Sequence, residues 1–541
     1  MRIIVLGGVA AGTKVAAKLM REDRSNEVII LNKGENISYA GCGLPYYVGH
    51  VIEEKEQLIV NTPIKYEKLT GAQVFTNKEA IKVDKEKKKV TAIDCKTGEE
   101  TVYTYDKLVI ATGASPVRPS IEGINLKNVF VMRTPEDAIM LRELADSQEV
   151  KRAVVVGAGY IGLELAENLM NLGIKPFVMD MADQVLPGFD QDIAEYIETK
   201  LAENKIPVLT NTEVIRIEGD KKVEKVITNK RAFKADMVIL CAGIRPNTAF
   251  LDSTGLEMVK GTLLTNAKGQ TNDENIYAVG DCAMVSNAIT NKAVWSPMGS
   301  TANINGRLVA QNIAGAKLNY KGTLGTAICK LAEFNVGRTG LTMEDAVKEG
   351  FNAVSVITVV DDKAHYMPGA SSFIIKMIAD RKSLMLLGVQ VIGKGAVDKI
   401  IDMTVTAMMC HATLNDLEDM DLAYAPPFST AIHPFTQTVN ILKNKINGVF
   451  DTFTPQEYAS KKAEGYQIID TCLVPSIEGA PYVDLTSVNG MMSGFEPEDP
   501  LLLVCNKGKR AYLLQNRLKY YGYQNTKVLE GGISFTNVTV E

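Results

Sequence analysis

The sequence lacks the residue patterns that several classes of protein require. Its eight cysteines are spread singly with no C-x-x-C, and its four histidines have no metal-ligand spacing. These absences argue against a metal site and against a secreted disulfide framework. No basic run is interleaved with aromatic residues, and the 541 residues carry a net charge of -5, so we do not expect nucleic acid as a partner.

Long apolar runs are missing as well. No stretch is long enough to cross a bilayer, and a strand begins at once at Arg2–Leu6, which leaves no room for a signal peptide. We therefore expect a cytoplasmic protein with no membrane partner. With 46% hydrophobic residues, the chain should form about three to five domains.

Glycine, in contrast, gathers in two strand–turn–helix units. The turns are GGVAAG at Gly7–Gly12 and GAGYIG at Gly157–Gly162. The predicted strands and helices around them are Arg2–Leu6, Thr13–Arg21, Val28–Leu31, Arg152–Val156, Leu163–Leu172 and Pro176–Asp180. Such turns let backbone N–H groups at a helix N-terminus meet a pyrophosphate, so two dinucleotides are predicted. Tight helix–strand packing is the alternative explanation of the glycines.

The second unit has a complete dinucleotide fingerprint. Gly157, Gly159 and Gly162 are in register, and Asp180 ends the next strand, where a carboxylate can accept both ribose hydroxyls. A 2′-phosphate would need cationic neighbours instead, and Asp180 stands between two methionines. The pattern therefore favours NADH over NADPH.

The first unit departs from the fingerprint at two positions. Val9 stands where the middle glycine is expected, and Asn32 stands where the ribose carboxylate is expected. Asn32 can still form a hydrogen bond with a hydroxyl, although without charge.

Further strand-like runs lie between and after the two units and look like segments that return to them, and additional domains follow. ATGA at Ala111–Ala114, CAGIRPN at Cys241–Asn247 and IYAVGDC at Ile276–Cys282 end strand-like runs. From about Gly322, predicted strands alternate before helices begin, as in an α+β interface domain; these strands are Val354–Val360, Phe373–Ile378 and Leu386–Val391. A small α/β domain follows near Phe450, with a predicted helix and two strands at Pro455–Glu464, Gln467–Asp470 and Leu501–Val504.

Two dinucleotide units, with ATGA between them and YAVGDC after them, resemble the flavoprotein pyridine nucleotide–disulfide oxidoreductases, over about the first 440 residues. The resemblance implies an α/β fold with two Rossmann-like domains, FAD in the first and NAD(P)H in the second. The expected domains are FAD-binding (1–115 and 245–320), NAD(H)-binding (116–244), dimerisation (321–445) and rhodanese-like α/β (446–541). The expected cofactor-binding residues are Gly7, Gly8, Gly12, Asn32, Thr112, Gly113, Asp281, Ala302, Gly157, Gly159, Tyr160, Gly162, Asp180 and Gly243, with Asp281 on the flavin's ribityl chain.

The segment SYAGCGLPYYVG resembles the single-cysteine branch of this family, with Cys42 as its redox centre. Ile37 and Tyr47 occupy the positions that would complete a C-x4-C pair, so Cys42 should cycle through a mixed disulfide, persulfide or sulfenate. Crowding by Gly41, Gly43 and Pro45 favours an exposed turn, where a helix dipole or the oxidised flavin could stabilise a thiolate. A buried, inert cysteine is the alternative.

Within this branch, the coenzyme A-disulfide reductases and NADH-dependent persulfide reductases carry SF-x-N-C-x-LPY, from which this chain departs at Tyr39 and Gly41. The resemblance implies a homodimer in which Tyr366 and Tyr424 of one subunit protonate the thiol leaving the other subunit's site. Lys18, Arg21 and Ser38 are the expected contacts to coenzyme A. Interface tyrosines and a solvated basic pair are the alternatives.

CNKGKR at Cys505–Arg510 resembles the C-x-x-G-x-R active loop of rhodaneses, over about the last 90 residues. Its N–H groups, with Arg510 and two lysines, should favour a thiolate or persulfide at Cys505. The usual DVR is Asp470-Thr471-Cys472 here, and the expected histidine after it is missing. A purely structural domain is the alternative.

These observations predict an NADH-dependent, FAD-containing enzyme that reduces a small thiol-derived substrate. Cys42 would reduce coenzyme A persulfide, polysulfide or coenzyme A disulfide, and Cys505 would handle sulfane sulfur. Two other functions stay open: an NADH oxidase or peroxidase acting through a Cys42 sulfenate, and a sulfur-carrier or redox-sensing protein. Ala10 stands where related oxidases and peroxidases carry a histidine, which counts against the first of them.

Overall fold

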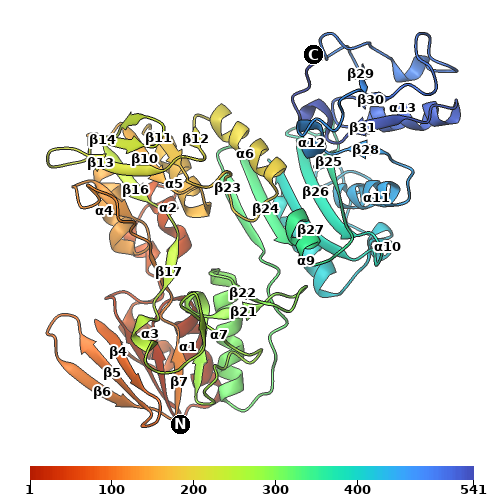
Figure 1. The fold of residues 1–541 in the computed structure, drawn as a ribbon. Helices are drawn as coiled ribbons and strands as arrows, with labels where there is room; N and C mark the ends of the chain where they lie inside the picture. Colours follow the sequence, from red (N-terminus) through yellow and green to blue (C-terminus); the bar gives the residue numbers. More distant parts are fainter. Residues whose placement is uncertain (541) are drawn as a thin grey trace. The chain divides into compact units, whose positions relative to one another are not determined.

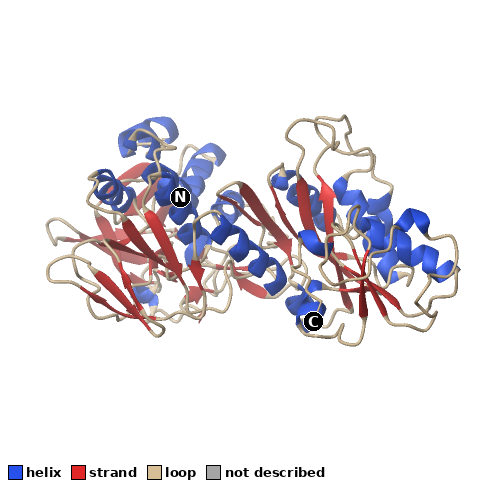
Figure 2. Cartoon of the chain, turned by 90° about the horizontal axis from the view of Figure 1, so that it is seen from above, coloured by secondary structure: helices blue, strands red, loops and turns tan. Residues whose placement is uncertain are grey.

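The computed structural model describes residues 1–540 as two compact units (Figure 1). The first comprises Met1–Val185 and Lys205–Thr323, and the second comprises Leu186–Asn204 and the chain from Leu324. Both units combine helices with strands (Figure 2). Among the described residues, no helix is both long and apolar enough to span a membrane.

The first dinucleotide unit forms a parallel sheet with strand order β20-β7-β1-β2-β3. Its elements are β1 (Arg2–Leu6), α1 (Ala10–Glu22), β2 (Glu27–Asn32), α3 (Pro63–Thr70), β3 (Gln73–Thr76), β7 (Lys107–Ile110), β20 (Ile276–Ala278) and α7 (Gly299–Ile313). A Cβ on Gly12 would lie 1.9 Å from the Gly7 carbonyl oxygen, so only glycine permits this turn. Helix α1 starts at Ala10, inside this turn, and so earlier than the predicted start at Thr13.

A second parallel sheet, with strand order β12-β11-β10-β16-β9, repeats this arrangement. Its elements are β9 (Val129–Val131), α4 (Pro135–Asp146), β10 (Arg152–Val156), α5 (Tyr160–Asn171), β11 (Lys175–Met179), β12 (Val208–Leu209) and β16 (Met237–Leu240). Antiparallel strands flank the two sheets: β4 (Lys78–Asp84), β5 (Lys89–Asp94), β6 (Glu100–Thr104), β13 (Val214–Glu218), β14 (Lys225–Thr228) and β15 (Ala232–Lys234). The two predicted dinucleotide folds are thus present.

Helix α6 (Gln191–Glu203) belongs to the second unit, although it lies inside the range predicted to bind NAD(H). The buried Lys376 ammonium lies 2.8 Å from both carboxylate oxygens of Asp192 and 3.2 Å from Asp190 Oδ2. Gln390 also donates to Asp190 Oδ2, at 2.7 Å. These long-range pairs hold α6 on the sheet of the second unit. No local sequence pattern predicts these pairs.

That sheet is antiparallel, with strand order β23-β24-β27-β26-β25. Its elements are β23 (Ala327–Leu331), β24 (Phe334–Gly340), α8 (Met343–Lys348), β25 (Ala353–Asp361), β26 (Ser372–Asp380), β27 (Leu386–Gly393), α9 (Val397–Met409), α10 (Leu414–Glu418) and α11 (Pro434–Ile446). The three strands predicted here are present, each longer than predicted by two or three residues.

The C-terminal part forms a parallel sheet with strand order β28-β31-β30-β29. Its elements are β28 (Thr452–Phe453), α12 (Pro455–Ala459), β29 (Gln467–Asp470), β30 (Leu501–Val504), α13 (Lys509–Tyr520) and β31 (Thr526–Leu529). Helix α12 is shorter than the predicted Pro455–Glu464, because the chain turns through a left-handed Lys461.

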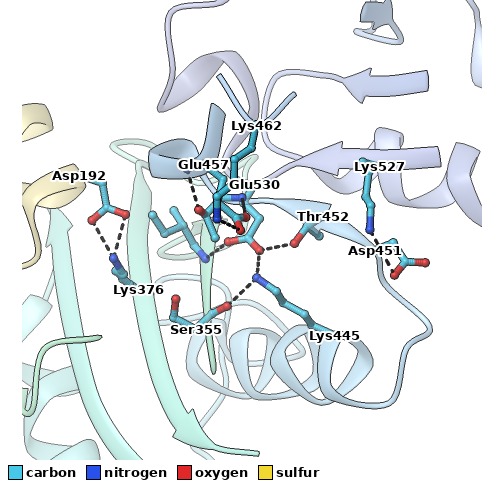
Figure 3. Close-up of polar contacts among 12 residues, drawn as sticks. Asp192, Ser355, Lys376, Lys445, Asp451, Thr452, Glu457, Lys462, Lys527 and Glu530 are labelled. Atoms are coloured by element: carbon cyan, nitrogen blue, oxygen red, sulfur yellow. Dashed lines mark hydrogen bonds and ion pairs between the residues drawn. The ribbon is translucent and has the colours of Figure 1, made fainter. Parts of the chain in front are cut away.

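A buried carboxylate, Glu530, joins this part to the antiparallel sheet (Figure 3). Lys445 and Thr452 donate to its Oε1 at 2.5 and 2.6 Å, and the Ile357 N–H donates to its Oε2 at 2.8 Å. Because a buried charge is costly unless it is fully paired, this network fixes the two sheets of the second unit together.

Candidate active site

Cys42 lies in a 3-10 turn, Gly41–Gly43, directly before the short helix α2 (Leu44–Val48). The thiol is free and the residue is exposed. A Cβ on Gly43 would lie 3.0 Å from Ile52 Cδ1, so a larger residue would disturb the turn. The predicted exposed, glycine-crowded turn is confirmed.

The charges around Cys42 come from three separate elements. Burial raises the pKa of the Cys42 thiol; the carboxylates of Glu164 and Asp281 raise it further, and Arg133 lowers it. The protein groups by themselves therefore favour the thiol over the thiolate. The predicted stabilisation of a thiolate by a helix dipole or by the oxidised flavin stays a prediction.

Asp281 forms an ion pair that the sequence did not reveal. The Arg133 Nη2 atom donates to Asp281 Oδ2 at 2.7 Å, and the Trp295 indole donates to the Asp281 carbonyl at 2.8 Å. Arg133 directly precedes Thr134, the N-cap of α4. The sequence pattern at Thr134 predicts where helix α4 starts, but it does not predict which residue Arg133 contacts. Only the folded structure shows that Arg133 pairs with Asp281 and so belongs to the site.

Glu164, on helix α5, is a second site residue that sequence reasoning missed. The Tyr46 hydroxyl donates to its Oε1 at 3.2 Å, which joins α5 to α2 beside Cys42. Burial raises the pKa of Glu164 from 4.5 to about 7, with Tyr46 acting in the opposite direction. A carboxyl group that titrates near neutral pH is therefore built into the surroundings of the cysteine.

The raised pKa predicts how stability depends on pH. The stability that protonated Glu164 contributes is fully present below pH 4.5 and is lost as the pH rises through about 7. We expect Glu164→Gln to melt several degrees above the wild type at about pH 8, and at nearly the same temperature at about pH 5. Thermal melting followed by circular dichroism measures both. The exposed Glu143→Gln is the matched control, and an equal difference at both pH values would contradict the prediction.

The two glycine turns fit dinucleotides. Helices α1 and α5 begin without a side-chain cap and without an acidic residue in the first turn, so their first N–H groups are left for an anion. A Cβ added to Gly159 would meet no atom within 4 Å, which leaves room beside the second turn. Pyrophosphate groups could therefore be held at both helix starts.

Equivalent side chains shape the two turns. Asn32 Oδ1 accepts from the Gly8 N–H at 2.9 Å, and Asp180 Oδ2 accepts from the Ala158 N–H at 2.7 Å. The Asn32 amide also donates to the carbonyls of Gly34 and Asn36. The structure thus assigns Asn32 to the shape of the first turn, and its contact with a ribose hydroxyl stays a prediction.

The other predicted cofactor residues lie on segments that return to the two turns. The Thr112 hydroxyl donates to the Asn247 carbonyl at 2.8 Å, and Asn247 Nδ2 donates to the Thr112 carbonyl at 3.0 Å. Gly113 and Gly243 adopt φ angles of +65° and +97°, which favour glycine. Ala302 is buried on α7, next to the strand end that carries Asp281.

Tyr366 and Tyr424 come together in the second unit, although they are far apart in sequence. Their hydroxyl groups are near enough for Tyr366 to influence the ionisation of Tyr424, and 64% and 50% of their surfaces are exposed. Desolvation and the neighbouring Tyr366 hydroxyl raise the pKa of Tyr424. Two adjacent, exposed phenols can bind and protonate a departing thiolate.

The three predicted coenzyme A contacts lie around the first turn and helix α1. Lys18 forms an ion pair with Glu22, one turn along α1, while Arg21 is exposed. Ser38 has a φ angle of +49°, and its N–H donates to the Gly8 carbonyl at 2.9 Å. The Glu22 partner already neutralises part of the predicted basic pair.

The Cys505 loop has the geometry of an anion-binding turn. The N–H groups of Gly508 and Ala511 donate to Cys505 Sγ at 3.2 and 3.5 Å. Gly508 takes a φ angle of +89°, which the loop requires. Arg510 donates to the Thr471 carbonyl and to Asp484 Oδ1, so it anchors the loop and shares its charge with a carboxylate.

Lys507 links this loop to the hairpin that carries Tyr366. Its ammonium lies 2.6 Å from Asp361 Oδ1 and 2.8 Å from Ser372 Oγ. Asp361, the last residue of β25, pairs with Ser372, the first residue of β26, and Tyr366 lies in the loop that connects the two strands. The Cys505 loop is therefore attached, through Lys507, to the strand ends from which the loop with Tyr366 extends.

Two dinucleotide turns, the exposed Cys42 in its glycine turn and the Cys505 loop define a pyridine-nucleotide-dependent thiol oxidoreductase. Residues 1–297 match the family described as pyridine nucleotide-disulphide oxidoreductase, residues 326–435 match its dimerisation domain, and residues 438–535 match the rhodanese-like domain. The chain belongs to the pyridine nucleotide-disulphide oxidoreductase family. The predicted resemblance and fold class are confirmed, and membership implies FAD and NAD(P)H as cofactors.

Named relatives cover most or all of the chain. An NAD(P)H coenzyme A polysulfide/persulfide reductase of Pyrococcus horikoshii is 35% identical over 444 residues, which are 82% of this chain and 98% of that protein. The structure of reduced Bacillus anthracis CoADR-RHD has a TM-score of 0.94 at 32% identity and covers 99% of this chain and 97% of that one. An NAD-dependent persulfide reductase from A. fulgidus also has a TM-score of 0.94 at 32% identity, covering 99% and 100%.

Proposed function

We propose that this enzyme uses NADH, FAD and Cys42 to reduce coenzyme A persulfide, polysulfide or coenzyme A disulfide. The observation that carries the proposal is the exposed, free Cys42 in a glycine-crowded turn within a two-dinucleotide fold. Relatives that are named as reductases of coenzyme A polysulfide or persulfide support this substrate class.

The residues have separate tasks in the proposed reaction. Cys42 attacks the sulfur–sulfur bond of the substrate and takes one half as a mixed disulfide or persulfide. Tyr366 and Tyr424 of the partner subunit in a homodimer donate a proton to the departing thiolate. Lys18, Arg21 and Ser38 hold the phosphates and adenosine end of coenzyme A.

The cofactor sites follow the two turns. Gly7, Gly8, Gly12, Asn32, Thr112, Gly113, Asp281 and Ala302 would hold FAD, and Gly157, Gly159, Tyr160, Gly162, Asp180 and Gly243 would hold NADH. When bound, FAD supplies the transfer of reducing equivalents from NADH to Cys42. Asp180 favours NADH, since its carboxylate would repel a 2′-phosphate.

The test is a set of parallel NADH assays with coenzyme A disulfide, coenzyme A persulfide, polysulfide and oxygen as acceptors. We expect turnover with the sulfur acceptors, fastest with persulfide or polysulfide, and at most slow oxygen consumption. NADPH in place of NADH should lower kcat/KM by about tenfold or more. Fast oxygen consumption without an added thiol substrate would overturn the proposal in favour of an oxidase. Negligible turnover with every acceptor would favour a sulfur carrier.

A further inference from the structure

The rhodanese-like domain contains a second thiol next to Cys505. Strands β29 and β30 are parallel neighbours in which Asp470 pairs with Val504, and the Thr471 N–H donates to the Val504 carbonyl at 2.8 Å. Cys505 follows β30 by one residue and Cys472 follows β29 by two. Both thiols therefore lie at the same edge of the sheet.

The spacing of the strands makes a disulfide between the two cysteines feasible. Adjacent strands lie about 4.8 Å apart, and Cys472 and Cys505 follow the paired strand ends with an offset of one residue, so the backbone segments that carry the two thiols are neighbours. Disulfides join Cα atoms about 4.4–6.8 Å apart. Both residues are buried, with 0% and 2% of their surfaces exposed, so bulk solvent does not separate them.

The surroundings of the two sulfurs differ. Cys505 Sγ accepts two backbone N–H groups, as a thiolate or a persulfide anion requires. Cys472 is hydrogen-bonded to Asp470; burial, Asp470 and the charge of Cys505 raise the pKa of the Cys472 thiol to about 12. Cys472 is therefore protonated at rest, and its proton must pass to the neighbouring persulfide before its sulfur can attack.

The backbone around Cys472 is held in place. Asp470 accepts the N–H groups of Cys472, Ser476 and Ile477 at 2.6–2.9 Å. Arg510, five residues after Cys505, donates to the Thr471 carbonyl at 2.9 Å. One side chain of the sulfur-binding loop thus fixes the segment that carries the second thiol.

We propose that Cys472 resolves a persulfide on Cys505 inside this domain. Cys472 passes its proton to the outer sulfur of the Cys505 persulfide, and the resulting thiolate attacks the inner sulfur, which forms a Cys472–Cys505 disulfide and breaks the bond to the outer sulfur. The outer sulfur leaves as sulfide with this proton, so hydrogen sulfide is released. The outer sulfur is reduced, and the Cys472 thiol is oxidised.

Two equivalents of a small thiol then reduce the internal disulfide, which regenerates both protein thiols and yields one small disulfide. If that thiol is coenzyme A, the product is coenzyme A disulfide, which the Cys42 site could reduce. Only this link to Cys42 rests on the proposed function. The resolving step needs neither NADH nor Cys42, so the two can be tested separately.

The test treats the full-length enzyme with thiosulfate or polysulfide, without NADH or added thiol, and quenches it in acid. We expect the wild type to become lighter by two hydrogens, to show a Cys472–Cys505 linkage in its peptide map and to release one sulfide per chain. Cys472→Ala and Cys472→Ser should keep the extra sulfur on Cys505 and lose this burst of sulfide. Cys410→Ala removes an exposed cysteine of the same unit and should behave as the wild type.

The peptide map of the wild type needs no variant, so a folding defect in a variant does not affect the outcome. Two thiols that stay separately alkylatable after quenching, with or without sulfur on Cys505, would overturn the proposal. NADH assays with coenzyme A disulfide test Cys42 independently, so failure at one site is distinguishable from failure at the other.

Discussion

Cys42→Ser is expected to lower NADH-dependent reduction of coenzyme A persulfide by about a thousandfold or more. A serine hydroxyl cannot form the mixed disulfide or persulfide on which the proposed turnover depends, and its pKa is far too high for attack on sulfur. The rate of NADH absorbance loss, with and without the persulfide, measures the effect.

Two controls separate the loss of the thiol from a loss of folding. Cys95→Ser replaces another exposed, free cysteine of the first unit and should keep the wild-type rate. NADH should still reduce the bound flavin of Cys42→Ser in a single anaerobic turnover, since that transfer does not use the thiol. Full persulfide turnover by Cys42→Ser would remove Cys42 from the mechanism.

Glu530→Ala is expected to destabilise the second unit by about 3–5 kcal/mol. The mutation leaves the Lys445 ammonium, the Thr452 hydroxyl and the Ile357 N–H without the carboxylate that they share (Figure 3). The Lys445 charge is largely buried, so water does not replace the lost partner. Urea unfolding followed by circular dichroism should show an early transition of the rhodanese-like part.

The matched control breaks an ion pair on the surface. Glu333 lies 2.7 Å from Lys394, and both side chains are more than half exposed. Glu333→Ala should leave the urea midpoint unchanged, because solvent screens such a pair. Equal midpoints for both variants would show that the Glu530 network does not hold the domain in place.

Local patterns in the sequence predicted most of the fold. The strands Arg2–Leu6, Arg152–Val156, Gln467–Asp470 and Leu501–Val504 have the predicted bounds. Strand periodicity and glycine turns are properties of neighbouring residues, and they constrain the backbone wherever they occur. The redox turn at Cys42 and the loop at Cys505 were predictable for the same reason.

Pairs between distant residues were not predictable from these patterns. Arg133 meets Asp281, and Glu164 lies beside Cys42 with a raised pKa. A charged residue in a helix or loop looks like ordinary surface until the fold shows what it contacts. Burial and opposing charges, which set a pKa, exist only once the chain has folded.

The sequence by itself therefore determined the two dinucleotide turns, the lone Cys42 and the sulfur-binding loop, because each depends on the conformation of a few consecutive residues. The tertiary structure decided which charges surround Cys42, where α6 packs and that Cys472 and Cys505 follow the ends of neighbouring strands. Electrostatic and packing interactions act through space, and the distances along the chain do not specify them.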